Sequence, residues 1–293
     1  MSWRILVINN HSKLSYQNNN LIYRSIDRIE KIFIPEIHTL MLETTDIVIS
    51  TALVNKLLEN GVRIVFCDEK HNPSGEIQQY YGSHDTSKKV QQQMMWSDEI
   101  KRSVWTEIIT QKIINQSILL KELGYIRSYE KLQSYIKEVQ LFDPTNREGH
   151  AAKVYFNSLF GLDFSRDDDG NETNAYLNYG YTILLSVVNR EVIKNGNITQ
   201  VGLKHTNYFN PFNLSSDLME PFRVIVDKKV LQNKDSEFKR NKHSMLEIFS
   251  DVYLYQNKKM FLTNIIEHYV SKALKALNES KVKEMMEFRI GEL

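Results

Sequence analysis

Two glutamates and one histidine, in three separate segments of the sequence, have the residue types of a divalent metal site. They are Glu148, His205 and Glu220. Carboxylate oxygens suit hard ions such as Mg²⁺ and Mn²⁺, and an imidazole nitrogen shifts the preference toward Mn²⁺. A metal ion held by such ligands stabilises the charge of a phosphodiester under attack and lowers the pKa of a bound water or hydroxyl. If the fold brings the three side chains together, they form a metal site with the chemistry of phosphoryl transfer.

Each of these residues also has a purely structural explanation. Glu148 fits a capping box with Thr145, in which its carboxylate bonds back to the Thr145 amide. Glu220 is three residues after Asp217, which is itself a good helix cap. A single histidine is more often a hydrogen-bonded structural residue than a ligand, and this applies to His205. For each of the three positions, the role of metal ligand and the structural role therefore both remain open.

Composition limits the class of protein but does not identify it. The chain has 293 residues, 42% of them hydrophobic, and a formal net charge of +1. It can therefore bury a full core, and its overall charge gives no hint of a nucleic-acid partner. The single cysteine, Cys67, cannot form an internal disulfide and is expected to be a small buried strand residue. There is no long apolar run, and Trp3 begins a strand-like segment rather than a signal peptide, so we expect a cytoplasmic protein with no membrane partner.

The first eighty residues have the alternation and turn signals of β-structure. Gln17 to Asn20 and Asn72 to Gly75 are the expected turns. One helix is expected, capped by Ser50 or Thr51 and stopped by Asn60-Gly61. The expected strands cover residues 3–9, 13–16, 21–25, 31–34, 39–42, 46–49, 63–67 and 76–81.

The pattern changes to a helical period after Gly82-Ser83. Helices are expected at residues 88–93, 100–123, 126–139, 147–159, 174–194, 217–231, 245–255 and 264–276. The sequence thus predicts an α+β protein: a small β-rich N-terminal domain for dimerisation (residues 1–82), followed by a larger all-α domain for catalysis and DNA binding (residues 83–293).

Three groups of residues resemble motifs of one known family. The first is Arg147-Glu148-Gly149-x-Ala151-Ala152-x-x-Tyr155-Phe156, the second is Asn178-Tyr179-Gly180-Tyr181, and the third is His205-Thr206-Asn207 with Asp217-Leu218-Met219-Glu220-Pro221-Phe222-Arg223. Together they closely resemble the CRISPR-associated integrase family, and the β-then-helical pattern extends the resemblance over the whole chain. The third motif looks like the type II-A branch, in which glutamate is the last metal ligand.

The resemblance implies a function and partners. The family's metal ligands correspond to Glu148, His205 and Glu220, with Asp217 as an accessory acid near the site. The implied enzyme is a metal-dependent DNA endonuclease and integrase that uses Mg²⁺ or Mn²⁺. It inserts new spacers into a CRISPR array by attack of a 3′ hydroxyl on the repeat backbone. The implied assembly contains double-stranded DNA and two homodimers bridged by a dimer of a small ferredoxin-like CRISPR-associated subunit.

DNA contacts are expected from basic residues near the motifs. Phosphates are typically bound by such side chains, and the candidates are Arg147, His150, Lys153, Arg190, Lys194 and Lys204. His11, in a turn between two expected strands, is the candidate for stacking where the duplex ends fork. An exposed turn histidine is the alternative. Two other functions also fit the sequence: a structure-specific nuclease for branched DNA that does not integrate, and a non-catalytic DNA-binding scaffold.

Overall fold

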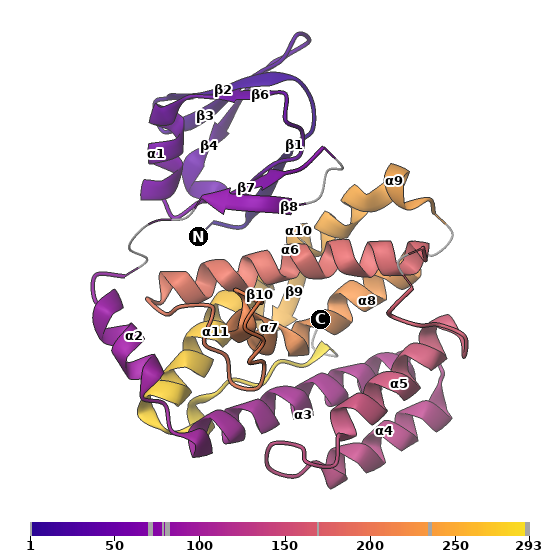
Figure 1. The fold of residues 1–293 in the computed structure, drawn as a ribbon. Helices are drawn as coiled ribbons and strands as arrows, with labels where there is room; N and C mark the ends of the chain where they lie inside the picture. The colour runs from indigo at the N-terminus through magenta and orange to yellow at the C-terminus, as the bar shows by residue number, and fades with distance from the viewer. Residues whose placement is uncertain are drawn as a thin grey trace.

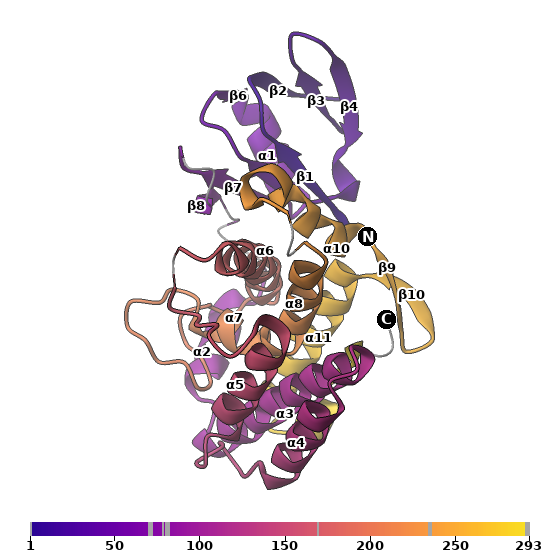
Figure 2. The ribbon, with the colours of Figure 1, turned by 90° about the vertical axis from the view of Figure 1, so that its right-hand side faces the viewer.

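A computed structural model describes residues 2–69, 73–77, 79, 83–168, 170–233 and 236–290. Its N-terminal part is β-rich and lies on one side of a larger helical part (Figures 1 and 2). The predicted α+β fold class is confirmed. The predicted boundary after residue 82 lies at residues outside the described ranges, and the change from strand to helix falls between Ile77 and Thr86.

Within its described residues, the N-terminal part has two four-stranded sheets with strand orders β1-β5-β7-β8 and β4-β3-β2-β6. The strands are β1 (Arg4–Ile8), β2 (Ser12–Gln17), β3 (Asn20–Arg24), β4 (Ile29–Phe33), β5 (Ile37–Leu42), β6 (Ile47–Ile49), β7 (Arg63–Cys67) and β8 (Pro73–Ile77). Helix α1 (Thr51–Glu59) begins at Ser50, whose side chain accepts a hydrogen bond from the Leu53 amide, and stops before Gly61 in the left-handed region, as predicted.

Of the turn predicted at Asn72 to Gly75, Asn72 lies outside the described residues, and the prediction is wrong for the other three. Residues 73–75 belong to β8, which pairs antiparallel with β7 at the edge of its sheet. Pro73 is the first residue of this edge strand, where its missing N–H does not interrupt a central ladder. The other predicted turn is confirmed, because Asn18 and Asn19 both have the positive φ that joins β2 to β3 as a tight hairpin.

The helical part is built around two long helices, α3 (Asp98–Glu122) and α6 (Glu172–Lys194). Gly180 lets α6 lie close to its neighbour, because a Cβ there would come within 2.5 Å of Val226 Cγ1. The other helices are α2 (Thr86–Met94), α4 (Ile126–Glu138), α5 (Arg147–Phe160), α7 (Asn213–Leu218), α8 (Arg223–Gln232), α9 (Phe238–Asn241), α10 (Glu247–Ser250) and α11 (Leu262–Glu279). None of the helices in the described ranges is long and apolar enough to cross a membrane.

Two helix predictions are wrong in part. The continuous helix expected over residues 217–231 is broken into α7, a 3-10 turn at Glu220–Phe222, and α8. Pro221 in that turn has no N–H to continue the hydrogen bonding of α7. The helix expected over residues 245–255 is instead a short helical stretch followed by the hairpin of β9 (Val252–Tyr255) and β10 (Lys258–Phe261), so this part is not all-α. Gln256 and Asn257 take positive φ in the hairpin turn.

Strand β5 belongs to the cores of both parts. All six of its residues are buried. Leu40 and Leu42 pack in the core of the β part, whereas Met41 packs in the core of the helical part. Because neighbouring side chains of a strand point to opposite faces, the β1-β5-β7 sheet is covered on both sides. The two parts are therefore packed against each other rather than joined by a free linker.

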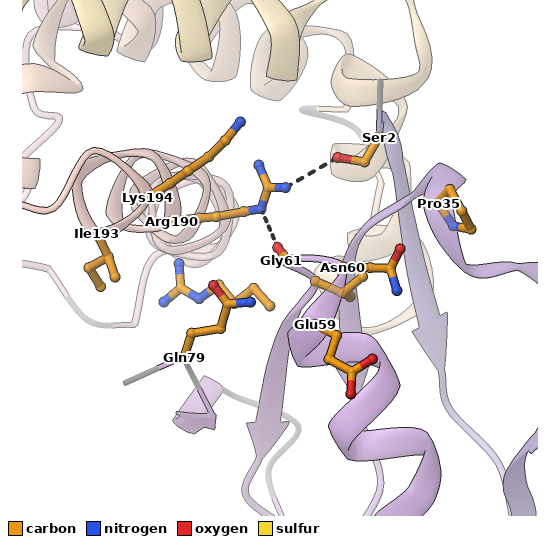
Figure 3. A pocket seen from close by; sticks show the side chains of 11 residues that line it. Ser2, Pro35, Glu59, Asn60, Gly61, Gln79, Arg190, Ile193 and Lys194 are labelled. Carbon is orange, nitrogen blue, oxygen red and sulfur yellow. Dashed lines mark hydrogen bonds between the residues drawn. The ribbon is translucent and has the colours of Figure 1, made fainter. Parts of the chain in front are cut away.

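Charged residues reinforce this packing. Arg190 on α6 donates a hydrogen bond of 2.8 Å to the Gly61 carbonyl and a second bond to Ser2, both drawn in Figure 3. Glu43, which follows β5, lies 2.8 Å from Lys242 Nζ and 2.7 Å from His243 Nε2. A cavity of about 470 Å³ lies at this junction, lined by residues of both parts. The junction thus carries a buried charge network as well as apolar contacts.

A buried carboxylate links helices α5, α6 and α8. Asp227 on α8 accepts a hydrogen bond of 2.9 Å from the Tyr155 hydroxyl and another from the Tyr181 hydroxyl. Burial raises the pKa of Asp227 to about 6, although the hydrogen bonds from Tyr181 and Tyr155 act to lower it. The protonated form is therefore favoured in the folded protein relative to the unfolded chain.

This raised pKa predicts a pH-dependent stability. The Asp227 pKa lies near 3.8 in the unfolded chain and near 6 in the folded protein, so its contribution is fully present below 3.8 and is lost as the pH rises through 6. We expect the free energy of unfolding to fall, relative to an Asp227→Asn variant, by up to about 3 kcal/mol as the pH rises over this window. Urea unfolding of the wild type and of Asp227→Asn at several pH values measures this difference in the free energy of unfolding. A constant difference between them across the window would contradict the assignment.

Candidate metal centre

The two glutamates predicted as ligands come together around a lysine. Lys112 Nζ donates a hydrogen bond to Glu148 Oε1 and lies 2.7 Å from Glu220 Oε2. Lys112 is on α3, Glu148 on α5, and Glu220 in the 3-10 turn before α8. Three elements thus place two carboxylates about one cation position. Lys112 and Glu220 are nearly buried, with side-chain exposures of 12% and 5%, whereas Glu148 is 29% exposed.

The first turn of α5 is organised without the help of the Glu148 side chain. Asp143 accepts hydrogen bonds from the backbone amides of Arg147 and Glu148, at 2.8 and 2.9 Å. Asn146 caps the helix by accepting from the Gly149 amide. The capping box with Thr145 is therefore wrong, since other side chains satisfy these amides. The Glu148 carboxylate is left to face Lys112.

A buried asparagine fixes the position of Glu220. Asn115, one turn beyond Lys112 on α3, donates a hydrogen bond of 3.0 Å to the Pro221 carbonyl. Its carbonyl oxygen accepts from the Ile290 amide, so the side chain cannot swing away without breaking several bonds. The Glu220 turn is consequently held against the same face of α3 that carries Lys112.

Arg223 completes the charge balance around Glu220. Its Nε lies 3.0 Å from Glu220 Oε1, and its guanidinium lies over the Tyr181 ring at 4.6 Å. Burial alone would raise the pKa of Glu220, but Arg223 and Lys112 together lower it, so the carboxylate is ionised. Within the described ranges, the buried Glu220 Oε2 has no hydrogen-bond donor in good geometry; its contact with Lys112 is an ion pair.

His205 is held by Asp217. His205 Nδ1 is hydrogen-bonded to Asp217 Oδ1, and the same carboxylate accepts from the backbone amides of Leu203, Lys204 and His205. Asp217 is completely buried, and it fixes the loop rather than capping a helix for Glu220 as the alternative proposed. The hydrogen bond with Asp217 raises the pKa of His205, and the nearby Glu220 charge adds to the effect. Trp105 lies edge-on to the His205 ring, with ring centres 5.9 Å apart.

These contacts decide how far the predicted triad has formed. Glu148 and Glu220 converge, and His205 lies near enough to Glu220 to interact electrostatically. Over the residues that the structure covers, no three His, Cys, Asp or Glu side chains are already arranged to bind a metal ion. The cation position is taken by the Lys112 ammonium. Two carboxylates facing one cation, one with an oxygen lacking a donor, are a donor set that fits a divalent metal.

Sequence reasoning missed Lys112, although a signal was present. On α3, the pair Gln111-Lys112 lies one turn from the pair Asn115-Gln116, on a helix whose other buried positions are mostly apolar. A polar stripe on the core-facing side of a helix requires partners, because unpaired buried polar groups are costly. The partners are distant in sequence, so the stripe alone does not name them.

The predicted DNA contacts fall into two regions. His150 and Lys153 are exposed on α5 beside Glu148, Arg147 pairs with Glu138, and the Lys204 ammonium lies 3.9 Å from the centre of the Phe142 ring. Arg190 and Lys194 instead lie at the junction of the two parts, paired with Glu191, and Lys194 also with Glu267. The nearly buried Arg190 has a structural role there. His11 is exposed between β1 and β2 and lies 2.9 Å from Asp46.

Comparison with known proteins identifies the family. The sequence model of the family described as "CRISPR associated protein Cas1" matches residues 5–254. The CRISPR-associated endonuclease Cas1 of Neisseria meningitidis serogroup C (strain 8013) is 35% identical over 231 residues, which are 79% of this chain and 76% of that protein. The chain belongs to the Cas1 family, which confirms the family predicted from the motifs and its endonuclease class.

Solved structures with the same fold support this placement. A casposase bound to integration product superposes with a TM-score of 0.79 at 18% identity, covering 100% of this chain and 94% of that one. A chain of a Cas6-RT-Cas1–Cas2 complex gives a TM-score of 0.76 at 17% identity, covering 98% of this chain. This protein spans only 36% of that longer chain. At these identities the superpositions show a shared fold.

Close backbone packing at Gly202 predicts how the His205 loop responds to substitution. A Cβ at Gly202 would come within 2.6 Å of the His205 carbonyl oxygen and 2.8 Å of Asp217 Oδ2. We expect Gly202→Ala to lower the free energy of unfolding by about 1–3 kcal/mol. We also expect the raised pKa of His205 to return toward its ordinary value, since the bond to Asp217 is disturbed. Urea unfolding and an NMR titration of the imidazole measure the two effects.

Gly75→Ala is the matched control, because a Cβ there meets nothing within 4 Å. If Gly202→Ala matched this control in stability and kept the His205 pKa of the wild type, the proposed packing of the loop on Asp217 would be wrong.

Proposed function

We propose that this protein is a divalent-metal-dependent DNA endonuclease and integrase. It inserts short duplex DNA into a CRISPR array by attack of a DNA 3′ hydroxyl on the repeat backbone. The observation that carries this proposal is the convergence of Glu148 and Glu220 on one cation position beside His205. Strand transfer exchanges one phosphodiester for another, so the reaction requires no nucleotide hydrolysis.

The proposed ligands of Mg²⁺ or Mn²⁺ are Glu148, His205 and Glu220. The bond between His205 Nδ1 and Asp217 leaves Nε2 as the coordinating nitrogen, and a carboxylate behind a ligating histidine is the usual support for it. When bound, the metal supplies charge stabilisation of the transferring phosphoryl group and activation of the attacking oxygen. Arg223 neutralises and orients Glu220, and Asp217 orients His205. Both are positioning residues.

Basic side chains near the site support binding of a DNA backbone: His150, Lys153 and Lys204 are exposed, and Arg147 is partly exposed and paired with Glu138. Arg147, His150 and Lys153 are three residues apart, which places them along one stripe of α5. Lys204 directly precedes His205. We assign phosphate contacts to these four residues, because a basic stripe beside a metal centre tracks a phosphate backbone. The role of His11 at the duplex fork remains part of the proposal and draws on its exposure in a turn.

The surface of β4 supports a homodimer. Ile29 and Phe33 are 66% and 46% exposed on this edge strand, and Ile26 just before it is 91% exposed. An apolar face on an edge strand is a typical protein contact. We propose that two such dimers are bridged by a dimer of a small ferredoxin-like CRISPR-associated subunit. The superposition on a chain from a complex that contains Cas2 supports this assembly.

The type II-A assignment is a finer proposal than family membership. It depends on the segment from Asp217 to Arg223, where glutamate stands at the last ligand position. The structure gives this glutamate two cationic neighbours, Lys112 and Arg223. A gene for the small ferredoxin-like subunit beside this one would support the predicted assembly.

The test of this function is the loss of strand transfer without loss of structure. We expect His205→Ala to reduce metal-dependent joining of a 3′-hydroxyl duplex to a repeat-containing half-site substrate by at least about a hundredfold, because a ligand to the reacting centre is removed. The variant should remain folded and dimeric by circular dichroism and light scattering. His268→Ala, an exposed histidine on α11, is the control and should keep wild-type activity.

Wild-type rates for His205→Ala would falsify the proposed ligand set. Cutting of branched DNA without any joining would instead identify a structure-specific nuclease. If Mn²⁺ failed to raise the melting temperature of the wild type, the scaffold function would be favoured, since a ligand that binds only the folded state stabilises it.

A further inference from the structure

We infer that Lys112 is an internal counter-cation: its ammonium holds Glu148 and Glu220 together in the metal-free protein and must withdraw when the metal binds. The inference rests on the proposed metal site and extends it to a residue outside the ligand set. Lys112 Nζ contacts both carboxylates from the nearly buried face of α3. It thus occupies the position at which a shared metal ion would contact the same oxygens.

The charges explain why a cation is needed there. Glu148 lies on α5 and Glu220 in the 3-10 turn before α8, and two carboxylates facing one point repel each other strongly where water is partly excluded. Arg223 Nε lies 3.0 Å from Glu220 Oε1, whereas its interaction with Glu148 is a weaker, longer-range electrostatic one. Among the residues that the structure describes, Lys112 is the cation that contacts both carboxylates. Without it, the metal-free protein would hold Glu148 near Glu220 with one positive neighbour instead of two.

Geometry explains why the lysine and the metal compete. A divalent ion held by both Glu148 and Glu220 would need their oxygens at about 2.0–2.2 Å, and Lys112 Nζ already contacts an oxygen of each. Two cations cannot share that position. A lysine is suited to leave, because its four-carbon stem is flexible and its ammonium makes no bidentate grip on either carboxylate. Arg223 pairs with the other oxygen of Glu220, Oε1, and can remain.

Competition has two measurable consequences. Removing the charge of Lys112 should lower the stability of the metal-free protein and at the same time raise its affinity for the metal. Loss of an ordinary ion pair would only lower the stability. We expect Lys112→Met, which keeps the length of the chain, to melt several degrees lower without metal. Its dissociation constant for Mn²⁺ should be lower by about tenfold, with a correspondingly larger rise in melting temperature on Mn²⁺ addition.

The experiment is calorimetric titration and thermal melting with Mn²⁺ as the probe, on the full chain. Lys101→Met is the matched control on the same helix, because Lys101 pairs with the exposed Asp98 at 2.8 Å. It should leave Mn²⁺ affinity unchanged. Lys112→Arg keeps a competing cation and should bind Mn²⁺ no more tightly than the wild type. Mn²⁺ affinity of Lys112→Met equal to or weaker than wild type would overturn the inference.

Two further measurements keep the outcome clear. Lysine acylation of the wild type, followed by mass spectrometry, should show Lys112 becoming more reactive with Mn²⁺ and Lys101 unchanged. This readout does not depend on whether Lys112→Met folds, and an unchanged Lys112 reactivity counts against the inference. Glu148→Gln separates the two proposals: if wild type and Glu148→Gln bind Mn²⁺ equally poorly, the metal site itself is wrong. If the wild type binds Mn²⁺ and Glu148→Gln does not, the metal site is supported, and the Lys112 variants then test the competition by themselves.

Discussion

The placement of two carboxylates, Glu148 and Glu220, at one partly buried point is the constraint on which the site depends. Such an arrangement is unfavourable unless positive charge lies between the groups and their hydrogen bonds are satisfied. The chain meets this requirement with Lys112 from α3 and Arg223 from α8. Much of the surrounding structure follows from it, because α3, α5 and the turn before α8 must approach one another closely enough for these charges to meet.

The elements that follow local rules were predictable from the sequence. The caps of α1, the hairpin at Asn18 and Asn19, and the long helices α3 and α6 all reflect turn chemistry or apolar period, which the chain carries locally. The hairpin of β9 and β10 was missed for the opposite reason. Its residues pack on the helical core, as the buried Tyr255 shows, and that environment overrides a weak helical pattern.

The candidate site was predictable in its residue types but not in its contacts. Glu148 and Glu220 had plausible roles as helix caps, and only the structure shows that Asp143 and Asn146 do the capping of α5 instead. Asp217 similarly serves three loop amides and an imidazole. The partners of Asp217 lie 12 to 14 residues away, so propensity and spacing do not reveal them. The Asn146 cap is local, but Thr145 beside it is also a good capping residue, and the sequence does not decide between them. Lys112 was missed because the polar stripe of α3 does not name its partners, Glu148 and Glu220, which are distant in sequence.

The double burial of β5 also affects how this protein can be divided. Met41 on one face of the strand belongs to the helical core, while Leu40 and Leu42 on the other belong to the β core. Separate expression of the helical part would uncover the apolar surface that Met41 and its neighbours now protect. In a separately expressed β part, the face of β5 that carries Met41 would likewise be exposed to solvent. The chain with both parts is therefore the unit that folds, and the unit that a gene fusion or an exchange between relatives must keep. This holds even though the candidate metal site lies in the helical part alone.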